Sequence, residues 1–113
     1  MYFGKEVRLF LKDQAKDKQV YLQNSSEKRF QSIFRSVERI TEILKENPQF
    51  GDPIAKNLIP AILDVQNLYR VELSNFWRML YTLEGDNNNV FVFIIRIMDH
   101  EEYDDLFGYK NKK

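Results

Sequence analysis

The only histidine of the chain, His100, lies where a strongly apolar stretch ends. It follows Asp99 and precedes two glutamates and Tyr103 in the segment Asp-His-Glu-Glu-Tyr. An imidazole has an unperturbed pKa of about 6.5, which suits proton transfer at neutral pH. The same segment also fits a plain helix start, with Asp99 as the cap. The sequence therefore leaves two interpretations open for His100, an active-site group and a helix-start residue.

Acidic residues surround this histidine, but their pattern does not favour a metal site. No second histidine supports binding of a metal ion, so we expect the acids to form a solvated helix face. These acids are Glu101, Glu102, Asp104 and Asp105. Cysteine is absent, which excludes disulfides, thiolate metal sites and cysteine nucleophiles. The sequence thus predicts no metal and no cofactor.

Two arginines lie on the strands that must position this segment. Alternating or continuously apolar residues predict three strands joined by short turns, over Leu68–Leu73, Phe76–Glu84 and Val90–Met98. Arg70 lies on the first strand and Arg78 on the second. Alternation puts Phe76, Arg78 and Leu80 on one sheet face. In isolation, such an arginine is typical of a salt-bridge partner at a strand edge.

The N-terminal part of the chain predicts the layer that covers the sheet. Glu6–Leu11 alternates like a short strand, and apolar residues at helical spacing between Phe30 and Leu44 predict an amphipathic helix. Ser25 or Ser26 is the expected cap of this helix, and Pro48 ends it. The order indicates an α+β fold, with helices packed on one face of an antiparallel sheet. Three residues of the helix should be nearly inaccessible to solvent: Phe34, Val37 and Ile40.

Composition narrows the class of protein. The 113 residues, 43% of them hydrophobic, predict one domain over residues 1–113. The 17 basic and 17 acidic residues give zero net charge, which argues against general nucleic-acid affinity. Residues 1–14 do not read as a signal peptide, and no stretch reaches the ~18 apolar residues of a membrane span. We therefore expect a cytoplasmic protein.

Several motifs together resemble one known superfamily. These are ILKENPQFGDPIAKNLIP, NLYRVELSNFWRMLYTLEG and the Asp-His-Glu-Glu-Tyr segment that runs into LFGYK. From about residue 30 onward they resemble the RelE/ParE superfamily of toxins from type II toxin–antitoxin pairs. The resemblance is closest to the RelE-like branch whose members share a WRxLYT strand and a DHxxYDxxFGY ending.

The resemblance implies a fold, a choice of activities and a partner. The fold has two N-terminal helices packed on an antiparallel sheet, in the order β-α-α-β-β-β with a short C-terminal helix. RelE-like members cut mRNA on the ribosome without a metal, using the RNA 2′-hydroxyl as nucleophile, whereas ParE-like members poison DNA gyrase. Both are silenced by a cognate antitoxin, and such partners lay a helix in a groove or add a strand to a sheet edge.

The resemblance also assigns residues to RNA cleavage, which needs a base, cations for the phosphorane-like transition state and an acid for the leaving oxygen. Arg78 takes the phosphate-stabilising position, and His100 takes that of the cation or acid. Tyr103 could stack on a base or share proton transfer. Arg70 and Lys56 are assigned to substrate binding.

One departure keeps a non-catalytic function open. Glu72 stands where RelE-like enzymes offer a second basic group; a glutamate could act as the base, but it would repel phosphate. The alternative is a binding module, either a ParE-like topoisomerase poison or a degenerate relative that only binds a partner protein.

The hairpin geometry gives the cleavage hypothesis a spatial prediction. Counting outward from the GDNNN turn pairs Arg78 with Arg96 or Met98. His100 then lies one pair further, roughly 5–8 Å away in cross-strand terms. We therefore predict that His100 lies at the rim of a concave face and reaches Arg78 through one bound phosphate, so that His100→Gln abolishes cleavage with little loss of stability.

Overall fold

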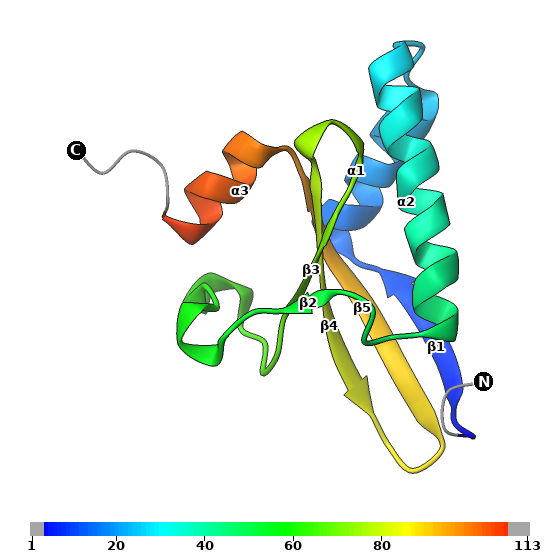
Figure 1. The fold of residues 1–113 in the computed structure, drawn as a ribbon, viewed down its shortest axis with the longest axis vertical. Helices are drawn as coiled ribbons and strands as arrows, with labels where there is room; N and C mark the ends of the chain where they lie inside the picture. The colour runs from blue at the N-terminus through cyan, green and yellow to red at the C-terminus, as the bar shows by residue number, and fades with distance from the viewer. Residues whose placement is uncertain (1–3, 109–113) are drawn as a thin grey trace.

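The computed structural model describes residues 4–108 and shows an α+β fold in which helices cover both faces of one sheet (Figure 1). Within that range three helices and five strands follow one another in the order β1, α1, α2, β2, β3, β4, β5 and α3. Their bounds are β1 Glu6–Leu11, α1 Asp13–Asn24, α2 Lys28–Glu46, β2 Asp52–Pro53, β3 Tyr69–Glu72, β4 Arg78–Gly85, β5 Asn89–Met98 and α3 His100–Phe107.

The sheet is mixed, which corrects the prediction of an antiparallel one. The strand order is β1-β5-β4-β3-β2, and β3, β4 and β5 form the expected antiparallel meander. β1 runs parallel to β5, with Leu11 opposite Ile94. A parallel pair needs a long connection between its strands, and the α1–α2 hairpin begins that connection. β1 and β5 consequently end at the same edge of the sheet, where α1 and α3 begin.

The two N-terminal helices cover one face of the sheet, as predicted. Val37 is 0% exposed and Ile40 is 2% exposed, which confirms two of the three inaccessible positions. The third, Phe34, is only partly buried, because Ile33 and Ser36 take the innermost positions of the stripe beside it. The predicted serine caps are also wrong. Glu27 precedes α2, and Ser25 Oγ accepts from the Glu27 amide before the helix begins.

The third helix lies on the opposite face of the sheet, which corrects the expectation that helices share one face. Its Tyr103 is 3% exposed and packs with Leu68, Leu80 and Met98 in a second, smaller core. Its start agrees with the sequence: Asp99 Oδ1 accepts from the Glu102 amide at 2.8 Å, and Glu102 Oε1 accepts from the Asp99 amide at 2.9 Å. This reciprocal capping box fixes where α3 leaves the sheet.

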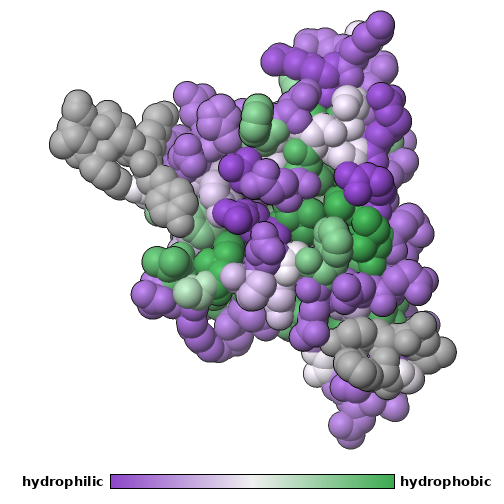
Figure 2. Space-filling model, viewed as in Figure 1, coloured by the Kyte–Doolittle hydropathy of each residue, from purple (hydrophilic) through white to green (hydrophobic). Residues whose placement is uncertain are grey.

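The loop between β2 and β3 completes the second face. It contains two short 3-10 turns, Lys56–Leu58 and Ala61–Leu63, and packs the partly buried Ile54 and Ile59 against the smaller core. Leu58 and Ile62 stay exposed, and a hydrophobic patch is visible over this loop in Figure 2. No helix within residues 4–108 has both the length and the apolar character that crossing a bilayer requires.

Candidate functional site

Three of the predicted site residues converge on the α3 side of the sheet. Arg70 on β3, Arg78 on β4 and Tyr103 on α3 form what we call the arginine–tyrosine cluster. The Arg70 Nη1 donates to the Tyr103 hydroxyl at 3.3 Å, and the Arg78 guanidinium carbon lies 5.2 Å from the centre of the Tyr103 ring. One aromatic side chain therefore contacts both cations.

Local structure explains why these residues meet. Arg70 pairs with Leu80 and Arg78 pairs with Met98, so alternation directs both arginines to the face that α3 covers. The pairing of Arg78 with Met98 confirms one of the two predicted registers. A β-bulge lies between these pairs and the turn, because Leu80 pairs with Arg96 while Tyr81 pairs with Ile94. The bulge leaves Ile95 as an extra residue on β5.

The two guanidinium groups are partly buried and incompletely hydrogen-bonded. The Arg78 side chain is 17% exposed, and its Nη1 donates to the carbonyl oxygen of Phe76 at 2.6 Å. The Nε atoms of Arg70 and Arg78 are both buried, and neither has a hydrogen-bond partner among residues 4–108. A buried charged donor without a partner is costly. An anionic ligand can reach only the exposed part of each side chain, which is 34% for Arg70 and 17% for Arg78.

Carboxylates next to the cluster partly neutralise it. Glu72 Oε2 lies 3.6 Å from Arg78 Nε, and Asp52 Oδ2 lies 3.7 Å from Arg70 Nη2. Both acids are more than half exposed, so these ion pairs are weak. The hydrogen bond to Tyr103 raises the pKa of Arg70 further above its ordinary value, with smaller contributions in the same direction from Glu72 and Asp52. Burial acts in the opposite direction, and Arg70, like any arginine, is positively charged at physiological pH.

The histidine lies apart from this cluster. His100 is exposed and lines a hollow of ≈ 380 Å³ with Ile33, Trp77 and four further residues, Arg29, Asn75, Asp99 and Glu101. Ile33 and Trp77 belong to the core under α1 and α2, whereas Arg78 faces α3. Among residues 4–108 the His100 side chain makes no hydrogen bond or ion pair. The structure thus places His100 in a hollow that Arg78 does not line, whereas the prediction had both residues reach one phosphate.

Lys56 is also separate from the cluster. It is exposed in the first 3-10 turn and lines a shallow hollow with Asp64 and Gln66. Asp52 was not among the predicted site residues, and its carboxylate faces Arg70. No sequence signal identified it, because the two-residue strand β2 is too short to give an alternation pattern.

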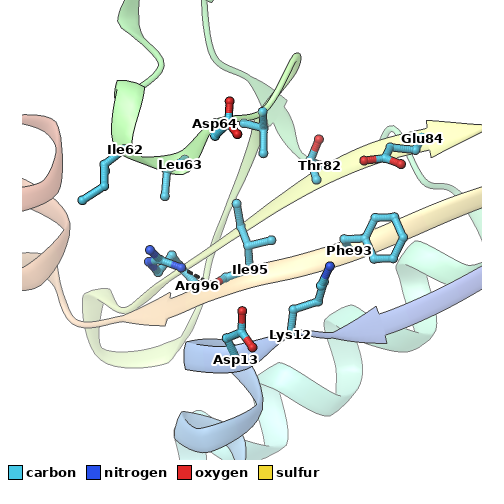
Figure 3. Close-up of a pocket in the computed structure, with 11 residues that line it drawn as sticks. Lys12, Asp13, Ile62, Leu63, Asp64, Thr82, Glu84, Phe93, Ile95 and Arg96 are labelled. Carbon is cyan, nitrogen blue, oxygen red and sulfur yellow. Dashed lines mark hydrogen bonds between the residues drawn. The ribbon is translucent and has the colours of Figure 1, made fainter.

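A further hollow lies on the same sheet face, nearer to β1 (Figure 3). It measures ≈ 360 Å³ and places Lys12 and Arg96 opposite Asp64 and Glu84, with Phe93 and Ile95 along β5. Its carboxylates, which include Asp13, outnumber its two cations. A phosphate is therefore better accommodated at the arginine–tyrosine cluster. No group of three or more metal-ligating side chains occurs in the described part of the chain.

Comparison with known proteins does not identify a family. No protein-family model matches this chain, and a search of curated proteins finds no relative. The arrangement of the described side chains is therefore the basis for a functional proposal.

Proposed function

We propose that this protein is the toxin component of a type II toxin–antitoxin pair and acts in the cytoplasm as a metal-independent mRNA endoribonuclease. The observation that carries the proposal is the convergence of Arg70, Arg78 and Tyr103 on one face of the sheet. Two helices between β1 and the β3–β4–β5 meander, followed by a short last helix, support a RelE-like arrangement.

In the proposed reaction, the RNA 2′-hydroxyl loses its proton to the base and attacks the adjacent phosphorus, and the 5′-oxygen leaves by taking a proton from water. Arg78 stabilises the negative charge that develops on the phosphorane-like transition state, and Arg70 holds the substrate backbone. Tyr103 acts as a positioning residue, because its 3% exposure leaves the ring little surface for a base while it contacts both guanidinium groups. Glu72 Oε2 lies 3.6 Å from Arg78 Nε, and Glu72 is the candidate base.

The experiment compares growth arrest and mRNA cleavage after induced expression of wild type, Arg78→Ala and His100→Gln. We expect wild type to arrest growth with cleaved transcripts, and Arg78→Ala to lose both effects. His100→Gln tests the sequence prediction directly. Since His100 lines a hollow that Arg78 does not line, we expect that variant to retain cleavage, and loss of cleavage at unchanged stability would return His100 to the active site. Transcripts that stay intact in arrested wild-type cells would refute the nuclease.

The second candidate function is a non-catalytic binding module. The observation that favours it is the pairing of both arginines with carboxylates, Arg78 with Glu72 and Arg70 with Asp52. Such a module would be a ParE-like topoisomerase poison or a relative that only binds a partner. Growth arrest with intact transcripts, together with inhibition of purified gyrase in a supercoiling assay, would select the topoisomerase poison.

A cognate antitoxin is the proposed partner under either function. Among the described strands β1 has β5 on one side only, so its other edge can accept an added strand. Co-expression with the product of a small adjacent gene, followed by pull-down, tests this partner. Absence of any such gene product bound to the chain would count against the toxin assignment.

A further inference from the structure

The loop between β3 and β4 presents an aromatic side chain next to the arginine–tyrosine cluster. Phe76 is 71% exposed, although an aromatic ring of this size is usually buried at least in part. Its carbonyl oxygen accepts from Arg78 Nη1 at 2.6 Å. An exposed ring therefore belongs to the residue whose backbone contacts the cation that we propose holds a phosphate.

The backbone of this loop disfavours the residue that it carries. Asn75 has φ 60° and Phe76 has φ 63°, so both are in the left-handed region. Asparagine tolerates this conformation, but a bulky aromatic residue adopts it rarely. Three-residue hairpin loops normally place glycine or asparagine at a left-handed position. Turn chemistry alone would therefore favour glycine at position 76.

The surrounding structure holds the loop in this conformation. The Leu73 amide donates to the Trp77 carbonyl at 2.8 Å, and the Trp77 amide donates to the Ser74 carbonyl at 3.2 Å. The Ser74 amide also donates to Ser36 Oγ on α2 at 3.3 Å. Strained residues persist where their surroundings over-determine them, and they cluster at sites that bind ligands.

We propose that Phe76 is a base-stacking residue, whose ring binds an unpaired base flanking the phosphate that Arg78 holds. This inference rests on the proposed function, since it takes single-stranded RNA as the ligand. Proteins bind single strands by combining cationic groups for the backbone with exposed aromatic rings for the bases. Phe76 and Arg78 supply these two elements two residues apart, with the Phe76 carbonyl in direct contact with the Arg78 guanidinium. A stacked ring accepts any base, so it adds affinity without fixing the sequence.

The test measures binding of purified protein to a fluorescein-labelled 2′-O-methyl RNA 12-mer of mixed sequence, which has no free 2′-hydroxyl and cannot be cleaved. Fluorescence anisotropy gives the Kd for wild type, Phe76→Ala, Phe76→Gly, Phe76→Trp and Arg78→Ala. Tyr21→Ala is the matched control, because Tyr21 is an aromatic residue that is 57% exposed on α1, in the helix layer of the other sheet face. Thermal unfolding of every variant is recorded in parallel.

We expect Phe76→Ala and Phe76→Gly to weaken binding by about 10-fold, the size of one lost base stack. Phe76→Trp should restore binding, and Tyr21→Ala should leave it unchanged. Phe76→Gly should unfold at a temperature no lower than wild type, because glycine relieves the left-handed strain. Reduced affinity in an equally stable variant would not follow from a purely structural role.

Two results would overturn the inference, and they are distinguishable. If the Phe76 variants bind like wild type while Arg78→Ala does not, the stacking role is wrong and the proposed function stands. The ring would then belong to a protein-contact surface. If wild-type protein neither binds this RNA nor cleaves transcripts in cells, the proposed function fails and the stacking role fails with it.

Discussion

Tyr81→Phe should destabilise the protein by roughly 2–4 kcal/mol, because two buried backbone groups lose their partner. The Tyr81 side chain is 0% exposed. Its hydroxyl donates to the Pro48 carbonyl at 2.7 Å and accepts from the Gly51 amide at 2.9 Å. The variant keeps the ring, and with it the stacking on Tyr69 at 5.1 Å between centroids. Only the hydrogen bonds that tie the chain after α2 to β4 are removed.

The same hydroxyl makes the stability of the folded protein depend on pH. Burial raises the pKa of Tyr81 from 10.0 to about 12 in the folded protein, because the phenolate is disfavoured away from water. The pKa of Tyr81 is higher in the folded than in the unfolded protein. The contribution of the protonated hydroxyl to the free energy of unfolding is therefore complete below pH 10 and is lost as the pH rises towards 12. A difference of about two pKa units corresponds to about 3 kcal/mol.

Urea unfolding of both proteins at neutral pH and at several alkaline values measures these effects. We expect the stability difference between wild type and Tyr81→Phe to shrink between pH 10 and pH 12, the interval in which Tyr81 ionises on unfolding. Other tyrosines and lysines titrate in both proteins, so the comparison cancels most of their contribution. A difference below about 0.5 kcal/mol at neutral pH, typical of a surface substitution, would refute the reasoning. A difference that does not change with pH would refute the pKa argument alone.

Three further predictions concern the N-cap of α3, the close packing at Gly51 and the carboxylate beside Arg78. Asp99→Ala should cost about 1 kcal/mol in urea unfolding, and Asp99→Asn should cost less, because the amide oxygen still accepts from the backbone. Gly51→Ala should lower the unfolding temperature, since its Cβ would lie 2.9 Å from the Tyr81 ring and 3.0 Å from the Arg70 carbonyl; an unchanged temperature would contradict this packing. Glu72→Gln should tighten binding to the 2′-O-methyl RNA about threefold, the effect of removing a screened repulsion of about 0.7 kcal/mol at ~6 Å, and weaker binding would contradict a repulsive role.

The sequence predicted those parts of the fold that depend on periodicity along one segment. The α2 stripe and the β3–β4–β5 meander have strong helical or alternating patterns, and both are present. The parallel pairing of β1 could not be predicted in this way, because the pattern of an isolated strand does not identify its neighbour. The start of α2 was predicted wrongly, because the Ser25 hydroxyl accepts a hydrogen bond from the Glu27 amide. This bond forms a turn that precedes the helix and does not cap it.

The placement of site residues was predicted correctly only where they lie on a regular β-strand. Alternation placed Arg78 and Leu80 on one sheet face, and the structure brings Arg78 together with Arg70 at Tyr103. His100 is the first residue of α3, so the turn at Asp99, and not strand alternation, sets its direction. The left-handed backbone at Phe76 was also missed, since an aromatic residue gives no sequence signal for it.

The pairing of β1 with β5 has a consequence for the order in which the chain folds. Leu11 and Ile94 are opposite each other, although most of the chain separates them. Contacts between such distant segments form late, because a long loop must close before they contribute. At typical rates of synthesis, the ribosome needs on the order of 4–16 s to add the residues between these two strands. β1 cannot complete its native pairing during that interval, so the full sheet, and any activity that depends on it, arises only when synthesis has passed β5.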